Sequence, residues 1–317
     1  MSSRSGSSRR RTRAGLSRLR AGMIALALSA LVVTGCAARH GTAAPANPTG
    51  PVPGVPSGPG AASSPALRVA TQPTAAVPAT AAQTGRRWIP PPGTTWQWQL
   101  TGPVDLTVDA DIYDIDGFDN GADVVAELHR RGRKAVCYIE AGAYADFRPD
   151  RGDWPADLIG KPNGWPGERW IDIRDPGRVE PVLSRRFDMC RDKGFDGVEP
   201  DLMEHFTNDT GFPITARDQL VFNRFLARLG HDRGLSVALK NDVEQVSELV
   251  GDFDFTVNEE CFAFHECAAL RPFIAAGKAV LHAEYDIAPG TYCPQTTSLG
   301  LSSIHKDWDL DASRQTC

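Results

Sequence analysis

Acidic residues stand where several short apolar segments of this chain end. Four such segments end in Asp116, Glu140, Asp201 and Glu259. Two carboxyl groups on either side of a glycosidic bond can protonate the leaving oxygen and stabilise positive charge on the sugar ring. Aromatic rings beside them would stack on pyranose faces. These residue types indicate a sugar-cleaving site. Its candidate substrate contacts are Trp96, Trp98, Asp114, Asp116, Tyr138, Glu140, Glu199, Lys240, Asn241, Glu260, Glu284 and Tyr285.

Eight apolar segments must position these side chains. They are predicted as strands at residues 96–100, 111–116, 135–140, 197–201, 237–241, 255–259, 280–285 and 302–306. Helical patterns are found at 122–131, 179–193, 216–233 and 268–276. Each of these patterns ends at a glycine, the usual residue for the left-handed turn that closes a helix. Eight strand units with intervening helices predict an α/β domain folded as a (β/α)8 TIM-like barrel.

The position of the carboxylates at strand ends favours one shared site. Any one of them could instead be a solvated loop charge or an ion-pair partner of Arg174, Lys240 or Lys306. A barrel brings the carboxyl ends of all its strands to one mouth, where active sites of this fold lie. Clustering across six or seven strands is therefore poorly explained by isolated surface charges.

The charge of the chain changes sharply along its length. The first 87 residues contain 11 of the 34 Lys and Arg residues and none of the 39 Asp and Glu residues. Residues 88–317 therefore have a formal net charge near −16. Such a field repels nucleic acid phosphates and attracts cations. We expect no nucleic acid partner.

The first 87 residues have the pattern of an export signal and a tether. Seven arginines precede an uncharged, mostly apolar run from Ala21 to Gly35, which is too short to span a bilayer comfortably. The run ends in Val33-Thr34-Gly35-Cys36, which resembles a bacterial lipobox. We predict a lipoprotein signal peptide over 1–35 and lipidation of Cys36; the alternative is an ordinary secretory peptide with an incidental cysteine. Residues 36–87, rich in Pro, Ala, Gly and Thr, are predicted to be a disordered tether. The domain at 88–317 would then be exported and held on the extracytoplasmic face of the cell membrane.

Six cysteines remain when Cys36 is set aside. An even number in an exported protein favours disulfides over metal binding or thiol catalysis. The expected pairs are Cys261 with Cys267, Cys293 with Cys317 and, by remainder, Cys137 with Cys190. The six histidines of the domain do not form ligand-spaced pairs. We expect no metal and no cofactor, which weakens the alternative of a metal-dependent polysaccharide deacetylase.

Five motifs together resemble glycoside hydrolase family 114, a family of endo-α-1,4-polygalactosaminidases. They are Gly194-Phe-Asp-Gly-Val-Glu-Pro-Asp201, Val237-Ala-Leu-Lys-Asn241, Val257-Asn-Glu-Glu-Cys-Phe-Ala-Phe-His-Glu-Cys267, Gly277-Lys-Ala-Val280 and Ala283-Glu-Tyr285. The resemblance runs from about Trp96 to the C-terminus, in order and at the spacing of barrel strands. The chain departs from the family pattern after Asp201, where Leu202 and Met203 stand.

The resemblance implies a (β/α)8 enzyme that hydrolyses α-1,4-linked galactosamine polymers. Its catalytic pair would be Asp201 after the fourth strand and Glu259 after the sixth. By the retaining pattern Asp201 is the nucleophile and Glu259 the acid/base, with carboxyl groups about 5 to 5.5 Å apart; the opposite assignment stays open. The expected partner is a galactosamine-containing polysaccharide, and the expected state is a monomer. A non-catalytic, surface carbohydrate-binding lipoprotein is the other alternative.

Overall fold

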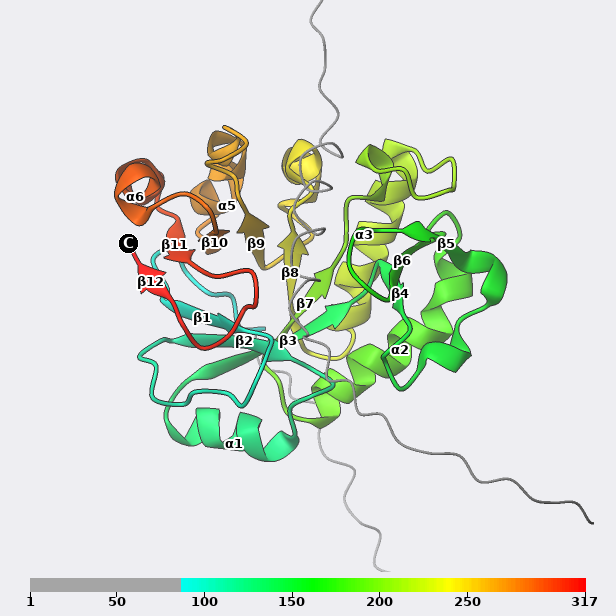
Figure 1. Cartoon of the computed structure of the whole chain (residues 1–317), viewed down its shortest axis with the longest axis horizontal. Helices are drawn as coiled ribbons and strands as arrows, with labels where there is room; N and C mark the ends of the chain where they lie inside the picture. The colour runs from blue at the N-terminus through cyan, green and yellow to red at the C-terminus, as the bar shows by residue number, and fades with distance from the viewer. Residues whose placement is uncertain (1–86) are drawn as a thin grey trace, which may run out of the picture. The chain divides into compact units, whose positions relative to one another are not determined.

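The computed structural model describes residues 87–317, which form an α/β domain (Figure 1). The predicted signal peptide, the lipidation site Cys36 and nearly all of the tether lie outside these residues. Within residues 87–317 no helix is both long enough and apolar enough to cross a membrane.

Eight parallel strands form the central sheet. They are β1 (Trp96–Gln99), β2 (Ile112–Asp116), β3 (Lys134–Glu140), β7 (Gly197–Asp201), β8 (Ser236–Lys240), β9 (Phe255–Glu259), β10 (Val280–Glu284) and β11 (Ser302–His305). Each strand pairs in parallel with the next one of this series. The sheet curls as in a TIM-like barrel, with helices around its outside (Figure 1). All eight predicted strands are found within one residue of their expected ends, because their apolar runs are buried on both faces of the sheet.

Six α-helices accompany the strands. They are α1 (Ala122–Arg130), α2 (Pro176–Asp192), α3 (Ala216–His231), α4 (Val246–Leu249), α5 (Arg271–Ala275) and α6 (Pro289–Ser298). The helix predicted at 268–276 is instead a 3-10 turn, Cys267–Leu270, followed by the short α5. Helix α6 has no amphipathic pattern and contains Pro294, which explains why its sequence gave no helical signal.

A second, smaller sheet lies between β3 and α2 in the chain and was not predicted. Its strands are β4 (Ala143–Ala145), β5 (Ile159–Pro162) and β6 (Glu168–Ile171), in the order β4-β6-β5, and both pairings are antiparallel. The segment carries several side chains to the carboxyl ends of the barrel strands, as described below.

The C-terminal segment joins the two ends of the curled sheet. Strand β12 (Gln315–Thr316) pairs antiparallel with β11. Just before it, the carbonyl of Leu310 accepts hydrogen bonds from the backbone amides of Leu100 and Thr101, which follow β1. Lys306 Nζ donates to two carbonyls of the same segment, those of Asp311 and Ser313. The tail therefore fills the seam between the last and first barrel strands.

The three predicted disulfides are confirmed. Cys137 of β3 pairs with Cys190 of α2, Cys261 pairs with Cys267, and Cys293 of α6 pairs with Cys317. The last of these fixes the C-terminal tail at the seam. In the part of the chain that the structure describes, the one cluster of potential metal ligands is Cys261, Cys267 and His282. Its two sulfur atoms bond to each other and are therefore not thiolates.

Candidate active site

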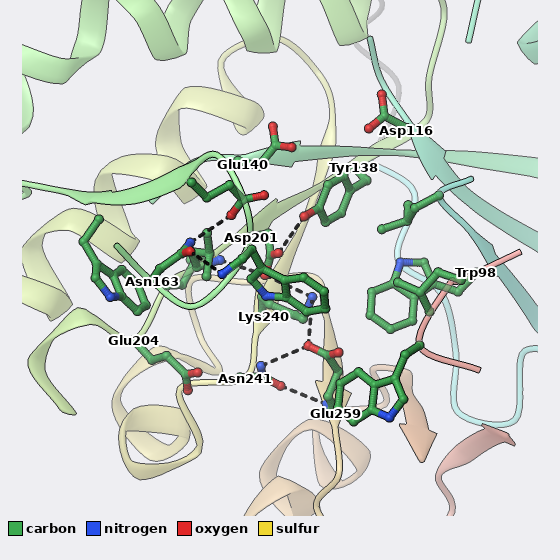
Figure 2. A pocket seen from close by; sticks show the side chains of 18 of the residues that line it. Trp98, Asp116, Tyr138, Glu140, Asn163, Asp201, Glu204, Lys240, Asn241 and Glu259 are labelled. Atoms are coloured by element: carbon green, nitrogen blue, oxygen red, sulfur yellow. Dashed lines mark hydrogen bonds and ion pairs between the residues drawn. The ribbon is translucent and has the colours of Figure 1, made fainter. Parts of the chain in front are cut away.

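A cavity of about 560 Å³ opens at the carboxyl ends of the barrel strands. It is lined by side chains from β1, β2, β3, β7, β8 and β9 and by the loops that follow them (Figure 2). The predicted site residues that line it are Trp98, Asp116, Tyr138, Glu140, Asp201, Lys240, Asn241, Glu259 and Glu260. The barrel therefore brings both predicted catalytic residues, 58 positions apart in sequence, into one cavity.

The ammonium group of Lys240 lies at the centre of the cavity floor. Its Nζ is 2.7 Å from Glu199 Oε1, 3.1 Å from Asp201 Oδ1 and 3.4 Å from Glu259 Oε2. It also lies over the ring of Trp98, 4.7 Å from the ring centroid. Burial alone would lower the pKa of Lys240, but the charges of Asp201, Glu199 and Glu259 outweigh burial and hold the pKa well above its usual value. Lys240 is therefore a fixed cation.

Asp201, at the end of β7, is held by three donors. Its Oδ2 accepts from the Tyr138 hydroxyl at 2.7 Å, and its Oδ1 accepts from the Leu202 amide at 2.7 Å. The third donor is Lys240. Burial, and then the charge of Asp201, raises the pKa of Tyr138 well above its usual range, which keeps the phenol protonated as a donor. The three donors fix the orientation of the Asp201 side chain.

Glu259, at the end of β9, is also held by three groups, the third being Lys240. The Tyr285 hydroxyl donates to its Oε1. The Asn241 amide donates to its Oε2 at 3.4 Å (Figure 2). Asn241 also accepts a hydrogen bond from the Glu259 backbone amide, at 2.9 Å. Asp201 Oδ1 and Glu259 Oε2 both contact Lys240 Nζ, at 3.1 and 3.4 Å, and these two oxygens are therefore at most 6.5 Å apart.

The backbone turns sharply after each of the three central strands. Leu202, Asn241 and Glu260 follow β7, β8 and β9 directly, and their φ angles are 64°, 49° and 58°. Residues with a side chain rarely adopt this left-handed region, and such backbone strain is concentrated at functional sites. Leu202, where the sequence departs from the family pattern, occupies one of these turns.

Close packing of Gly142 supports the turn at Leu202. The amides of Ala141 and Gly142 both donate to the Asp201 carbonyl, at 3.1 and 2.9 Å. A Cβ atom at position 142 would lie 1.8 Å from the Leu202 carbonyl oxygen and 2.5 Å from a ring carbon of His205. Only glycine fits without moving the backbone that carries Asp201.

We expect Gly142→Ala to lower kcat by about 10- to 100-fold, because displacing a reacting group by about 1 Å can cost about 100-fold. Overpacking should also lower the free energy of unfolding by about 1–3 kcal/mol. Steady-state kinetics and denaturant unfolding would measure both effects. The matched control is Gly152→Ala, where a Cβ would meet no atom within 4 Å. Wild-type kinetics for Gly142→Ala would refute this role of the glycine.

Asp116 and Glu140 line the cavity, but both form ion pairs with an arginine. Arg148 Nε lies 3.0 Å from both carboxylate oxygens of Glu140, and Arg148 Nη1 lies 3.2 Å from Asp116 Oδ1. All three side chains are buried. Among the cations suggested by the sequence, only Lys240 pairs with site carboxylates, since Arg174 pairs with Asp172 and Lys306 holds the tail. Arg148, from the unpredicted β4–β5 connection, is the cation that the sequence did not reveal.

Five predicted substrate contacts, Trp96, Asp114, Glu199, Glu284 and Tyr285, do not line the cavity. Trp96 is buried at the seam, where its indole donates to the Ser302 carbonyl. Asp114 and Glu199 are fully buried below the floor. Burial and the neighbouring charge of Glu199 raise the pKa of Asp114 well above its usual value, which favours the protonated acid. The remaining two, Glu284 and Tyr285, support the Glu259 loop instead.

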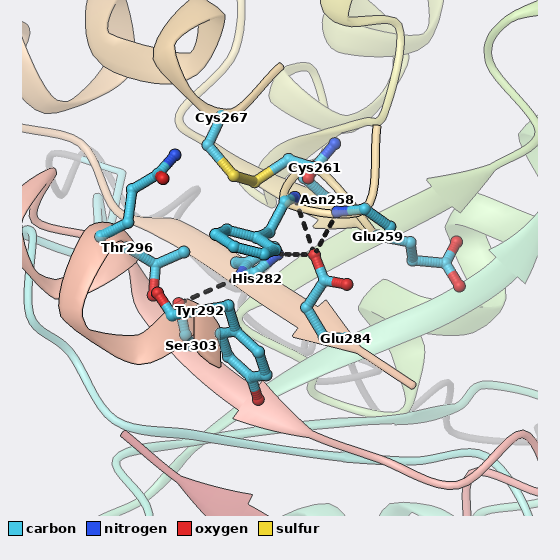
Figure 3. Close-up of a disulfide and its surroundings, with 12 residues drawn as sticks. Asn258, Glu259, Cys261, Cys267, His282, Glu284, Tyr292, Thr296 and Ser303 are labelled. Carbon is cyan, nitrogen blue, oxygen red and sulfur yellow. Dashed lines mark hydrogen bonds and ion pairs between the residues drawn. A yellow bond between two sulfur atoms is a disulfide. The ribbon is translucent and has the colours of Figure 1, made fainter. Parts of the chain in front are cut away.

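The loop after Glu259 is held in place by a disulfide and by hydrogen bonds to buried side chains (Figure 3). Glu284 Oε1 accepts from the Phe262 amide at 2.8 Å and lies 3.0 Å from His282 Nε2. The disulfide from Cys261 to Cys267 closes the same short loop. Tyr285 stacks on Trp308, with ring centroids 4.0 Å apart, while its hydroxyl contacts Glu259. Glu284, Tyr285 and the disulfide are buried and fix the position of Glu259 without lining the cavity, whereas Trp308 lines it.

Several cavity residues were missed by the sequence interpretation. They include Phe147, Arg148, Asn163, Trp165, Glu168 and Glu204. Most come from the long connection between β3 and α2, where no strand pattern was recognised. Two aromatic residues in that connection, Phe147 (54% exposed) and Trp165 (52% exposed), line the cavity and could stack on sugar rings.

The chain matches known proteins over this whole region. The model of glycoside hydrolase family GH114 matches residues 77–317. The crystal structure of Ega3 from Aspergillus fumigatus, in complex with galactosamine, is similar at 35% sequence identity with a TM-score of 0.70, over 74% of this chain and 99% of that one. The glycoside hydrolase domain of PelA from Pseudomonas aeruginosa shares the fold at 15% identity and a TM-score of 0.55, over 71% of this chain and 98% of that one. Among curated proteins there is no match. The chain therefore belongs to glycoside hydrolase family GH114, and it is a glycoside hydrolase.

Proposed function

We propose that this enzyme cleaves α-1,4-galactosamine linkages within a cationic exopolysaccharide, using Asp201 and Glu259 as a retaining pair. The observation that carries the proposal is the meeting of these two carboxylates on Lys240 in the cavity floor. Their facing oxygens are at most 6.5 Å apart. Retaining enzymes need about 5 to 5.5 Å between carboxyl groups, whereas inverting enzymes need about 6.5 to 9.5 Å to admit a water molecule.

The hydrogen bonds of the two groups support distinct roles. Asp201 has three close donors, which suits a nucleophile that must be ionised before it attacks the anomeric carbon. Glu259 accepts a hydrogen bond from the Tyr285 hydroxyl and makes two longer contacts of 3.4 Å, with Asn241 and Lys240, and in the proposed mechanism it is the group that gains and loses a proton. In the first step Glu259 protonates the leaving oxygen while Asp201 forms a covalent bond to the sugar. In the second step Glu259 takes a proton from water, and the resulting hydroxide displaces Asp201.

The charge of the domain supports an amino sugar as substrate. Residues 88–317 carry a net charge near −16, and protonated amines on a polysaccharide would be attracted to such a surface. Ega3, at 35% identity, was crystallised with galactosamine. Aromatic side chains from separate loops, among them Trp165 and Trp308, line the cavity and could stack on successive sugar units. An open cavity of this kind is suited to cleavage within a chain.

The proposal is tested by incubating the protein with deacetylated galactosaminogalactan, chitosan and polygalacturonate and following new reducing ends. We expect cleavage of the galactosamine polymer and none of polygalacturonate. Proton NMR of the first product should show the α anomer before mutarotation. Cleavage of polygalacturonate alone would overturn the substrate assignment, and a β anomer as the first product would overturn the retaining assignment.

We further propose that the protein is exported and anchored to the membrane through lipidated Cys36, acting there as a monomer. Replacing Cys36 with Ala should release the protein from the membrane fraction or leave it unprocessed, because the acyl chains would supply its attachment. Immunoblots of fractionated cells that express the full chain would measure this. Ser63→Ala, in the predicted tether, is the control. If the Cys36 variant stayed in the membrane fraction as the wild type does, Cys36 would not be the membrane anchor.

A further inference from the structure

Glu168, the first residue of β6, enters the cavity from the second sheet. Its backbone and side chain close a tight turn with Asn163. The Glu168 amide donates to the Trp165 carbonyl at 3.1 Å, and the Asn163 side-chain amide donates to Glu168 Oε2 at 2.8 Å. The side-chain oxygen of Asn163 in turn accepts from the Trp165 amide at 3.0 Å. The carboxylate is therefore held in a defined position, and its other oxygen, Oε1, accepts no hydrogen bond from residues 87–317.

No cation in residues 87–317 pairs with Glu168. Three other carboxylates of the cavity differ in this respect, because Asp116 and Glu140 share Arg148, and Asp201 contacts Lys240. Burial, together with the nearby charges of Glu140 and Asp201, raises the pKa of Glu168 to about 7, and the Asn163 hydrogen bond and the charge of Arg148, which is already shared by two other carboxylates, only partly oppose this rise. The surroundings of Glu168 thus lack one positive charge, which a ligand can bring.

The residues around Glu168 suit an ammonium group on a sugar better than a metal ion. A hard metal ion needs about six oxygen ligands, whereas the turn offers one carboxylate and an amide that is already used. Within the described chain, no group of potential metal ligands includes Glu168. Trp165, in the same turn, lines the cavity and is 52% exposed. A tryptophan face beside a carboxylate can bind a pyranose ring and its charged amine together.

We propose that Glu168 binds the ammonium group of one amino sugar unit, with Trp165 stacking on that unit, and that this subsite makes the enzyme prefer deacetylated polymer. The proposal rests on the proposed function for its substrate class. An N-acetyl group carries no charge and is bulkier, so it would leave Glu168 without a counter-ion. Glu168 is thus a specificity-determining residue, while Asp201 and Glu259 carry out the reaction.

The test uses Glu168→Gln in the full-length protein. Glutamine keeps the shape and the acceptor for Asn163 but removes the charge. We expect KM for deacetylated galactosamine polymer to rise about 10- to 100-fold, the range for losing a charge-assisted hydrogen bond, with kcat within about threefold. KM for a largely N-acetylated polymer should stay unchanged. The control is Asp146→Asn, which removes an exposed charge beside the same hairpin but outside the cavity lining.

The pH dependence of binding gives a second readout that needs no cleavage. Titration calorimetry with a galactosamine tetramer should show affinity rising as the pH increases through about 7, where Glu168 ionises, until the sugar amine loses its proton. Glu168→Gln should lose this rise. If the polymer is not cleaved but the tetramer shows this behaviour, the proposed function fails and the subsite stands. Unchanged KM, acetylation preference and binding profile in Glu168→Gln would overturn the subsite.

Discussion

Asp201→Asn and Glu259→Gln are each expected to reduce kcat by about 100- to 10,000-fold or more, the range attributed to a positioned acid or base. Both side chains meet at Lys240 in the cavity floor, and each swap removes ionisation with little change of volume. Folding and polymer binding should be retained. Steady-state kinetics, circular dichroism and polymer co-sedimentation would measure these three properties. Asp119→Asn, an exposed carboxylate on the cavity rim, is the control. Substantial turnover in either catalytic variant would contradict the assignment.

Azide rescue of alanine variants would separate the two roles. In Asp201→Ala, azide can occupy the space of the missing nucleophile and attack from its face, giving a glycosyl azide of inverted configuration. In Glu259→Ala, azide attacks the covalent intermediate on Asp201, and the azide product keeps the configuration of the substrate. If the two variants gave the opposite products, Glu259 would be the nucleophile and Asp201 the acid/base.

Lys240→Met is expected to destabilise the domain by about 3–5 kcal/mol near pH 7, the usual cost of leaving buried charges without their counter-ion. Lys240 is 1% exposed and is the shared cation of Glu199, Asp201 and Glu259. Without it these carboxyl groups should have raised pKa values in the folded state. A carboxyl group whose folded-state pKa is raised destabilises the fold above its unfolded-state pKa, and this effect fades as the pH falls and the group is protonated.

The difference in unfolding free energy between Lys240→Met and the wild type should therefore be smaller at pH 5 than at pH 7. Urea unfolding at both pH values would measure it. The control is Lys161→Met, which breaks an exposed pair with Asp209 and should cost less than about 1 kcal/mol. A Lys240→Met protein as stable as the wild type at pH 7 would contradict the role of this cation.

Much of the barrel could be predicted because its signals are local. The strands are short runs of buried apolar residues, and the helices 122–131, 179–193 and 216–233 end close to glycines that adopt the left-handed conformation. Cysteine number and spacing were enough for the three disulfides. The second sheet and α6 were missed because their segments have neither an apolar alternation nor a helical stripe. Backbone pairing between strands that are apart in the sequence, such as β4 and β6, leaves no pattern within either segment.

By itself, the sequence determined the strand order, the family and the two carboxylates that the barrel brings to one mouth. Only the tertiary structure decided which acids reach the cavity. Glu199 and Asp201 lie on the same face of β7, but two residues along a strand is a depth of about 6.6 Å, enough to put one below the floor and the other in the cavity. Glu168 reaches the cavity from the second sheet and Arg148 from the connection between its strands β4 and β5, and the placement of this sheet on the barrel depends on long-range packing. Local sequence patterns indicate which residues are buried. They do not indicate how far a side chain lies below the cavity floor or which charged side chain it contacts.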